Sequence, residues 1–447
     1  TPALWIAAER LPELLAVHAI ETTIAAPPSR ASRTWTRDEA IVELIRGRLT
    51  IVGPTTALAL AESLAMDTRD AETALLTLEA EGAILRGFFE QRDVLEWCDR
   101  RLLARIHRYT LNRLRAEIEP VTAADFMRFL FAWQHVTEKL DGIDGLQRIV
   151  RLLDGFEIAN GAWERTIFPL RMDRYDSALL DMLCLTGQVG WAATEGATAI
   201  FLRENADAWQ TLRGFREIVL SEAAQRILDT LRARGALFAR DLGDDVEEAL
   251  KELVSAGLVT SDGFLRKTIA SAGRWSALQP SAMTRESAVE IQARAFLLRY
   301  GVVFRRLLAR EPNAAPWREL TRVYRRLEAR GEIRGGRFVT GMSGEQFALP
   351  EAVERLREIR REGPNGRVVV ISAADPLNLV GILDAGERVR AIAANKIAYR
   401  DGIAVSAMEG DYLRPLAQLD DPSASEVAAA LAGRRVPVSR GYVGRMA

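Results

Sequence analysis

Four arginines recur along residues 317–329 and give this segment a chemistry that suits phosphate groups. They are Arg318, Arg322, Arg325 and Arg326. A guanidinium group can bind a phosphate through two parallel hydrogen bonds, so these side chains are candidates for contacts with nucleic acid. The alternative for Arg325 and Arg326 is that they pack against another module or against a second protomer.

The segment that carries these arginines has the pattern of an amphipathic helix followed by a β-hairpin. Apolar residues recur at i, i+3, i+4 and i+7, namely Leu320, Val323, Tyr324 and Leu327. Gly331 suits a helix C-cap, and Gly335-Gly336 suits the turn of a hairpin running from Ile333 to Phe338-Val339. A helix followed at once by a hairpin is the second half of a winged helix, and in such modules this helix can enter a DNA groove.

A second basic helix is predicted for residues 95–117. Four of its arginines share a face, namely Arg101, Arg105, Arg108 and Arg115, and the first three are the candidates for binding. This face could bind phosphates, or it could be a solvated face that is paired with neighbouring acids. Trp163 and Trp275 could each stack on a base, and the alternative is that they anchor the core.

Composition limits the other kinds of chemistry. The 447 residues have a net charge of -1, so nucleic acid would have to be bound by local patches. The sequence contains no Gly-Lys pair and therefore no phosphate-loop motif, so ATP hydrolysis within this segment is not supported. The 3 histidines and 2 cysteines are scattered, which argues against a metal site. We expect no metal and no cofactor in this segment.

The sequence also indicates where the protein would be found. No apolar run reaches membrane length and no stretch resembles a signal peptide, so we expect no membrane partner. The cysteine usage fits a reducing compartment, and the expected location is cytoplasmic. The chain begins Thr-Pro-Ala without Met, from which we expect a piece of a longer protein.

An internal repeat predicts the architecture. The sequence pattern LEAEGAI at 78–84 recurs in similar form as LKELVSAGLV at 250–259 and LEARGEI at 327–333. One helix-and-strand unit is therefore repeated along the chain. From residue 366 the pattern changes to short apolar runs at 368–372, 380–383, 390–393, 396–400 and 403–408. These runs predict a small antiparallel sheet or barrel, with Asp375 capping the turn after the first strand.

The predicted fold is therefore mainly α with β wings, with tandem winged-helix modules followed by a small β-barrel. The predicted domains are a helical lead-in at 1–36, a winged helix at 37–94, the basic helix plus a winged helix at 95–170, a winged-helix-like segment at 171–221, winged helices at 222–272 and 273–363, a β-barrel at 364–420 and a tail at 421–447.

Several long blocks resemble the C-terminal region of Lhr, the large helicase-related proteins of bacteria. They include LWIAAERLPEL, GRLTIVGPTTALALAESLAM, LLARIHRYTLNRLRAEIEPVTAADFMRFLFAWQHV, AWER, GEIRGGRFVTGMSGEQFALPEA and SAADPLNLVGIL. The resemblance implies about five tandem winged helices followed by a β-barrel, and it implies a homo-oligomer, with a tetramer as the favoured state. It also implies an upstream superfamily-2 helicase core, which would bind the ATP and magnesium.

The C-terminal two-thirds also resembles the AlkZ-type DNA glycosylases, which remove modified bases through a short Gln-x-Gln or Gln-x-Asp motif. Residues 152–157, LLDGFE, lie roughly where that motif would lie, with Asp154 and Glu157 near the expected positions and no Gln-x-Gln. The resemblance implies a carboxylate that orients or deprotonates a water beside the oxocarbenium ion of a flipped nucleoside. The alternative is a helix-to-wing turn that carries surface acids.

Three interpretations follow. The first is a DNA-binding and oligomerising region of an Lhr-type ATP-dependent DNA repair helicase, acting on single-stranded or duplex DNA and lacking an ATPase site of its own. The second is a DNA glycosylase for uracil or damaged bases with Asp154 or Glu157 in its site. The third is a structural hub that does not contact nucleic acid, which the near-neutral net charge keeps open.

Overall fold

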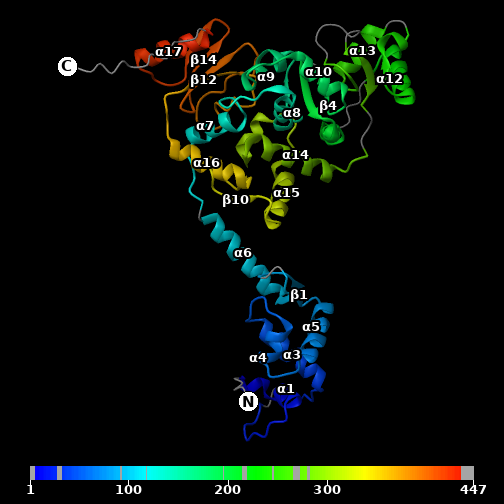
Figure 1. The fold of residues 1–447 in the computed structure, drawn as a ribbon, viewed down its shortest axis with the longest axis vertical. Helices are drawn as coiled ribbons and strands as arrows, with labels where there is room; N and C mark the ends of the chain where they lie inside the picture. Colours follow the sequence, from blue (N-terminus) through cyan, green and yellow to red (C-terminus); the bar gives the residue numbers. More distant parts are fainter. Residues whose placement is uncertain are drawn as a thin grey trace, which may run out of the picture. The chain divides into compact units, whose positions relative to one another are not determined.

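The computed structural model describes residues 6–27, 33–90, 93–116, 118–194, 196–213, 219–243, 246–264, 272–278 and 282–433. The chain divides into two compact units, residues 1–117 and residues 118–447, and each is described by itself (Figure 1). No helix in the described part of the chain combines the length and the apolar character that a membrane crossing requires.

The first unit is built around one winged helix. Its elements are a 3-10 turn at Ala8–Arg10, α1 (Leu11–Val17), α3 (Arg37–Leu49), α4 (Ala57–Ser63), α5 (Thr68–Ala80), β1 (Ile84–Gly87), β2 (Glu96–Asp99) and α6 (Arg100–Ala116). Thr36 and Glu39 form a capping box that starts α3, and β1 pairs with β2 as an antiparallel wing. Within the predicted helical lead-in at 1–36, α1 ends at Val17, and the described residues 18–27 form no helix. The predicted module 37–94 is too short, because β2 completes the wing.

The second unit begins with α7 (Ala123–Trp133) and a module centred on one sheet. This module comprises α8 (Gly142–Leu152), β3 (Glu157–Ala159), a π-helical turn at Trp163–Ile167, α9 (Phe168–Arg171), α10 (Ser177–Leu185), β4 (Val189–Thr194) and β5 (Ala197–Leu202). A 3-10 turn at Arg203–Asn205 and α11 (Ala206–Arg213) follow. The strand order is β3-β5-β4. Because β3 pairs with β5, one sheet spans the predicted boundary between residues 170 and 171.

A third module follows the same plan. It comprises α12 (Glu222–Arg234), β6 (Leu237–Phe238), a 3-10 turn at Ala239–Asp241, α13 (Val246–Ser255), β7 (Val259–Ser261) and β8 (Arg274–Ala277). Its strand order is β6-β8-β7. The predicted end at residue 272 omits β8, the strand that joins the other two.

The fourth module contains the arginine-bearing helix. It comprises α14 (Arg285–Tyr300), β9 (Val302–Phe304), a 3-10 segment η6 (Arg305–Arg310), α15 (Trp317–Ala329), β10 (Arg334–Gly336) and β11 (Gln346–Ala348), and α16 (Pro350–Glu362) follows it. The predicted helix is confirmed, but the predicted turn at Gly335-Gly336 is wrong. Both glycines lie in β10 and pair with β11, so the wing loop spans residues 337–345.

The last part of the chain is a four-stranded antiparallel sheet with a helix against it. Its elements are β12 (Val368–Ser372), β13 (Lys396–Arg400), β14 (Ile403–Glu409), β15 (Tyr412–Pro415) and α17 (Asp421–Leu431). The strand order is β12-β13-β14-β15, and no pairing in the described residues joins β15 to β12, so no closed barrel is found. The runs predicted as strands at 380–383 and 390–393 are turns and irregular chain. Beyond the helix, the predicted extended tail lies outside the described residues from residue 434 onward.

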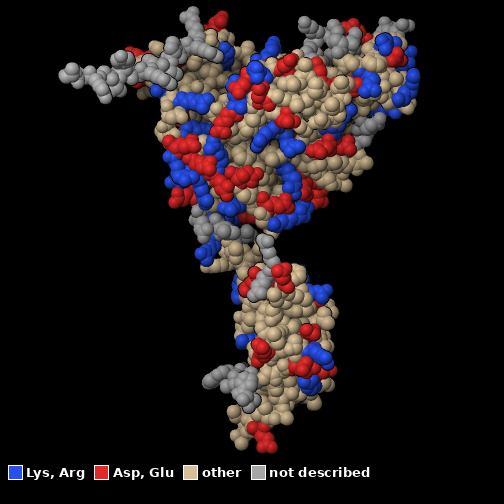
Figure 2. Space-filling model, in the orientation of Figure 1, with Lys and Arg blue, Asp and Glu red and all other residues tan. Residues whose placement is uncertain are grey.

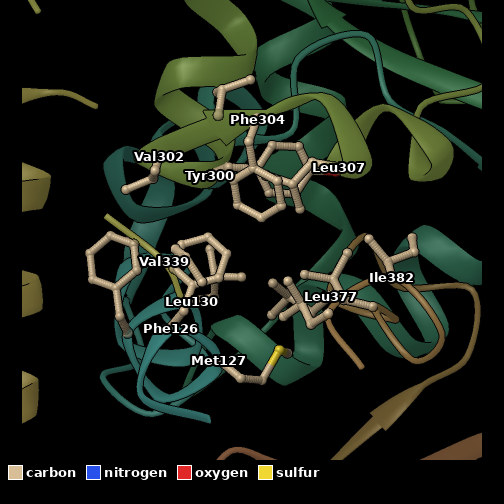
Figure 3. Packing of buried hydrophobic residues seen from close by; sticks show 14 of the residues in the cluster. Phe126, Met127, Leu130, Tyr300, Val302, Phe304, Leu307, Val339, Leu377 and Ile382 are labelled. Atoms are coloured by element: carbon tan, nitrogen blue, oxygen red, sulfur yellow. The ribbon is translucent and has the colours of Figure 1, made fainter. Parts of the chain in front are cut away.

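One apolar core joins the fourth module, α7 and the C-terminal sheet. Phe126 and Leu130 of α7 meet Tyr300 and Phe304 around α14 and β9, and Leu377 enters from the loop after β12 (Figure 3). All five side chains are at most 1% exposed. Burial of this much apolar surface ties the three elements into one body, so groups on them hold fixed positions relative to one another.

Candidate nucleic-acid interface

The four arginines of α15 fall into two pairs. Arg325 forms an ion pair with Glu345 at 2.8 Å, and Arg326 forms ion pairs with Glu286 at 2.6 Å and Glu290 at 3.2 Å. The remaining pair, Arg318 and Arg322, is exposed one helical turn apart and has no acidic partner in the described part of the chain. Only this second pair can meet an outside anion without first breaking an ion pair within the described residues.

The core fixes the direction in which α15 presents these side chains. Leu320 and Leu327 are at most 1% exposed, and the Tyr324 hydroxyl donates to the Ala293 carbonyl at 3.2 Å. Glu328 accepts a hydrogen bond from the backbone N–H of Gly335 at 3.2 Å, which connects the helix to the wing. The exposed face of α15 is therefore held on a rigid support, as a recognition helix requires.

The visible face of the second unit carries both signs of charge. Figure 2 shows basic and acidic side chains interspersed over it rather than one continuous basic stripe. This mixture agrees with the net charge of -1 and with the local pairing of Arg325 and Arg326. Any contact with a polyanion must therefore use selected arginines rather than a bulk positive field.

Helix α6 belongs to the first unit and not to the module that follows it, in contrast to the predicted domain 95–170. Asp99 caps its start by accepting from the N–H groups of Arg101 and Leu102 at 2.8 and 2.9 Å. The three predicted arginines are all exposed, and none has a carboxylate partner in the described part of the chain: Arg101, Arg105 and Arg108. Their predicted role in binding DNA stays a prediction.

The two tryptophans considered for base stacking are core residues. Trp163 is 0% exposed, its indole N–H donates to the Thr198 carbonyl at 2.8 Å, and its ring packs on Phe168. Trp275 is also 0% exposed and packs edge-on against Trp191. No ring face is left for a base in this conformation, so the core-anchor alternative is correct for both.

Asp154 is a buried, fully engaged carboxylate directly after α8. One of its oxygens accepts from the Leu202 N–H at 2.9 Å and from the Trp209 indole at 3.0 Å, and the other accepts from the Asn205 amide at 2.6 Å. Asp154 is only 2% exposed. Burial raises the pKa of Asp154 from 3.8 to about 6, although these three hydrogen bonds and the charge of Arg299 oppose the rise.

Glu157 is more accessible. It starts β3, its side chain is 15% exposed, and it forms an ion pair with Arg213 of α11 at 2.9 Å. In the described part of the chain, no arginine predicted to bind DNA contacts Asp154 or Glu157. The described residues likewise contain no cluster of three or more histidine, cysteine or acidic side chains that could hold a metal ion.

A buried ionic network missed by the sequence interpretation links these elements. Arg299 donates to the Asp154 carbonyl at 2.6 Å and pairs with Glu311, and Arg171 pairs with Asp375 at 2.7 Å. Arg171 and Asp375 are both 0% exposed. Arginine is rarely buried without a partner, but sequence alone does not name that partner, so no signal identified these pairs.

Two cavities of more than about 300 Å³ also lie among the described residues of the second unit. The larger, of about 690 Å³, lies between α7, α8, α14 and α16, and its lining includes Trp133, His135, Arg148 and Arg151. Burial lowers the pKa of His135, which favours a neutral imidazole there. The smaller cavity, of about 360 Å³, contains Arg305, Arg306 and Arg388. The adjacent pair Arg305-Arg306 was a visible signal for it in the sequence.

Comparison with known proteins follows this geometry. Family models for a winged-helix domain of the large helicase-related protein match residues 121–207 and 282–368. The first range contains the module 142–202, and the second contains the module with α15. The resemblance to the Lhr proteins is confirmed.

Two curated relatives carry the same family name. One, from Mycolicibacterium smegmatis, is named Lhr helicase/ probable uracil glycosylase and is 29% identical, with 84% of this chain and 28% of the relative covered. The other, from Escherichia coli, is named Lhr helicase/uracil glycosylase and is 27% identical, with 73% of this chain and 26% of the relative covered. The chain therefore spans about a quarter of the length of these Lhr relatives.

A solved structure, the DNA glycosylase AlkZ of Streptomyces sahachiroi, is also similar. It is 14% identical with a TM-score of 0.46, and the match covers 70% of this chain and 96% of that chain. At this level of structural similarity, no catalytic residue of AlkZ can be assigned to a position in this chain.

Proposed function

We propose that this chain is a DNA-binding region of an Lhr-type DNA repair helicase, and that α15 contacts backbone phosphates through Arg318 and Arg322. One observation carries the proposal. In a winged helix matched by the Lhr model, the helix in the recognition position presents two exposed arginines that have no internal acidic partner in the described chain. Arginine at such a position binds phosphate without first giving up an ion pair.

The proposal is tested by a pair of matched double variants on the same helix. Arg318→Ala with Arg322→Ala removes the pair without acidic partners, and Arg325→Ala with Arg326→Ala removes the pair that is bound to acids. Fluorescence anisotropy with a labelled duplex and a labelled single strand gives the affinities at one fixed salt concentration. We expect the first variant to bind about tenfold or more weakly and the second to bind within about threefold of the unaltered chain. Equal losses in both variants would argue against the assignment.

The rest of the Lhr-like assembly is part of the same proposal. The ATPase core, with its ATP and magnesium, would lie in the remaining length that the curated relatives have and this chain does not cover. Self-association, with a tetramer as the favoured state, would set several DNA-binding regions side by side in the cytoplasm. Light scattering coupled to size-exclusion chromatography measures this self-association directly, and a strict monomer at micromolar concentration would contradict it.

A second candidate function is base excision by this chain. Its support is the uracil glycosylase in the names of both relatives, together with two acids at the start of one sheet. Glu157 is the acid we favour for orienting a water, because its side chain is partly exposed while Asp154 would first have to release three hydrogen bonds. Asp154 remains the alternative acid.

An excision assay separates these roles. The substrates are uracil-containing single-stranded and duplex DNA, with alkali used to reveal abasic sites. Loss of product in Glu157→Gln, with DNA affinity retained, would support Glu157, and loss in Asp154→Asn alone would move the assignment to the buried acid. Full product in both variants would remove these two carboxylates from the reaction.

A further inference from the structure

Three arginines converge on one small cavity in the second unit. The cavity, of about 360 Å³, lies between η6, the wing loop of the fourth module and the loop that follows β12. Its charged lining residues are Arg305, Arg306 and Arg388. No acidic residue is among the described residues that line it, and the volume is within the range of pockets that hold small ligands.

The carboxylates of the two acids nearest in sequence to Arg388 contact groups other than the three cavity arginines. Asp384 accepts hydrogen bonds from the N–H groups of Gly381 and Gly386 at 2.8 and 2.9 Å, which uses its side chain to fix the loop. Glu387 faces Arg414 at 3.4 Å. In the described part of the chain, none of the three cavity arginines forms an ion pair with a carboxylate. Their positive charge is therefore not neutralised by the described residues.

Two of the three arginines donate to neutral backbone groups. Arg306 donates to the backbone carbonyl of Asp384 at 3.3 Å, and Arg388 donates to that of Ala309 at 3.4 Å. Each of these bonds is near the long limit for a hydrogen bond and uses one N–H, so the other N–H groups of both guanidinium groups remain for a ligand. The excess positive charge also acts on a neighbour, because burial lowers the pKa of Arg310 and the charge of Arg388 adds to that lowering.

The loop that forms one wall of the cavity turns tightly at Gly381. Gly381 has φ of +71°, and a Cβ placed there would lie 2.7 Å from the Gly386 carbonyl oxygen and 3.1 Å from the Arg388 side chain. A glycine is therefore needed to bring the Arg388 loop back against η6. Because η6 packs through Leu307 and the loop packs through Ile382 into the shared core (Figure 3), the backbone that carries the three arginines is held in place before any ligand arrives.

We propose that this cavity binds the dianionic phosphate of a phosphate monoester. Three unneutralised guanidinium groups match a group that carries a charge of about -1.5 to -2 at pH 7 better than they match the single charge of a backbone diester. Two sources have this chemistry, a free phosphate or mononucleotide and the phosphorylated end of a nucleic-acid strand. If the ligand is the phosphorylated end of a strand, the inference rests on the proposed function and adds an end-recognition site that is separate from α15.

Isothermal titration of the whole chain with inorganic phosphate, at ionic strength held constant with chloride, tests the site itself. Arg305→Ala with Arg388→Ala removes two of its cations. The matched control is Arg357→Ala with Arg361→Ala on α16, which also removes two exposed arginines that have no carboxylate partner in the described chain. We expect binding to the unaltered chain and to the control, and binding about tenfold or more weakly in the cavity variant. No binding up to about 10 mM phosphate, or equal binding in the cavity variant, would overturn the proposal.

A second arm identifies the source of the phosphate. Oligonucleotides that differ only in a 5′-phosphate or a 5′-hydroxyl are compared, with a mononucleotide alongside. A preference for the phosphorylated strand that disappears in the cavity variant supports a strand-end site. Equal binding of the two strands, with phosphate and mononucleotide still bound through the cavity arginines, supports the free-ligand source. The proposed function fails independently, because it requires Arg318→Ala with Arg322→Ala to lose DNA affinity whatever happens at the cavity.

Discussion

The substitution Asp154→Asn tests the physical account of the buried carboxylate. It keeps the shape of the side chain and removes its charge. The new carbonyl can accept from Leu202 and Trp209 as the present oxygen does. The new NH₂ group would face the Asn205 amide, which can rotate to present its own oxygen. The variant should therefore fold, and it should lack the titration of Asp154.

The magnitude follows from the pKa of Asp154. A rise from 3.8 to about 6 means that ionisation disfavours the folded state by about 3 kcal/mol at neutral pH. Below pH 3.8 the carboxyl group is protonated in both the folded and the unfolded state, so it does not lower the free energy of unfolding. The free energy of unfolding falls as the pH rises through about 6, because the folded state holds the proton more tightly. The difference in free energy of unfolding between Asp154→Asn and the unaltered chain should therefore grow by about 2 kcal/mol in favour of the variant from about pH 4 to pH 7.

Urea-induced unfolding followed by tryptophan fluorescence, repeated at several pH values, measures this difference. Asp207→Asn, which changes an exposed acid on α11, is the control for a general effect of losing one negative charge. A gap between Asp154→Asn and the unaltered chain that stays constant with pH would refute the reasoning. A gap that shrinks as the pH rises would show that the hydrogen bonds outweigh burial.

Three further results are expected. Arg171→Ala should lower the free energy of unfolding by about 3–5 kcal/mol in the same urea assay, because Asp375 is left charged and buried; a loss below about 1 kcal/mol would contradict that ion pair. Trp163→Phe should reduce stability by about 1–3 kcal/mol through removal of the indole hydrogen bond and leave DNA affinity unchanged; weaker binding by a stably folded variant would restore the stacking role. Alanine at Arg101, Arg105 and Arg108 of α6 should weaken DNA binding in anisotropy without a shift in Tm, and unchanged binding would leave them a solvated face.

Helical periodicity predicted the elements that carry the arginines. The helix from Trp317 was predicted to end at Arg330 and is found to end at Ala329, because apolar spacing and Gly331 both mark it. The repeated pattern likewise predicted a helix followed by strands at three places, and the structure has this arrangement at each of them. The pattern could not show that Arg325 and Arg326 are paired, since their partners Glu345 and Glu286 are remote in sequence.

The wing was mispredicted because two glycines were interpreted through turn chemistry alone. A Cβ at Gly336 would lie 2.2 Å from the Ile118 side chain, so that glycine makes room for a neighbour and not for a turn. The wing loop is instead organised by Gln346, whose amide accepts from Phe338 and Val339 and donates to Val339 and Met342. Such long-range close approaches leave no local pattern.

The predicted barrel is not confirmed, and two of its predicted strands are absent from the described sheet for a related reason. The apolar run at 380–383 is buried, but it packs into the shared core as a turn and forms no strand. The turn assignment of Asp375 was correct, since it accepts from the Leu377 N–H at 2.9 Å, yet its buried pairing with Arg171 was invisible. Short apolar runs do not distinguish a strand from a buried turn.

The salt dependence of DNA binding tests the central claim most directly. Removing one phosphate-binding arginine from α15 should reduce the slope of log affinity against log salt concentration by about 0.9 for duplex DNA. The account predicts that Arg318→Ala with Arg322→Ala lowers this slope by about 2, while Arg325→Ala with Arg326→Ala leaves it nearly unchanged. An unchanged slope in the first variant, with the fold intact, would contradict the assignment of α15 as the phosphate-contacting helix.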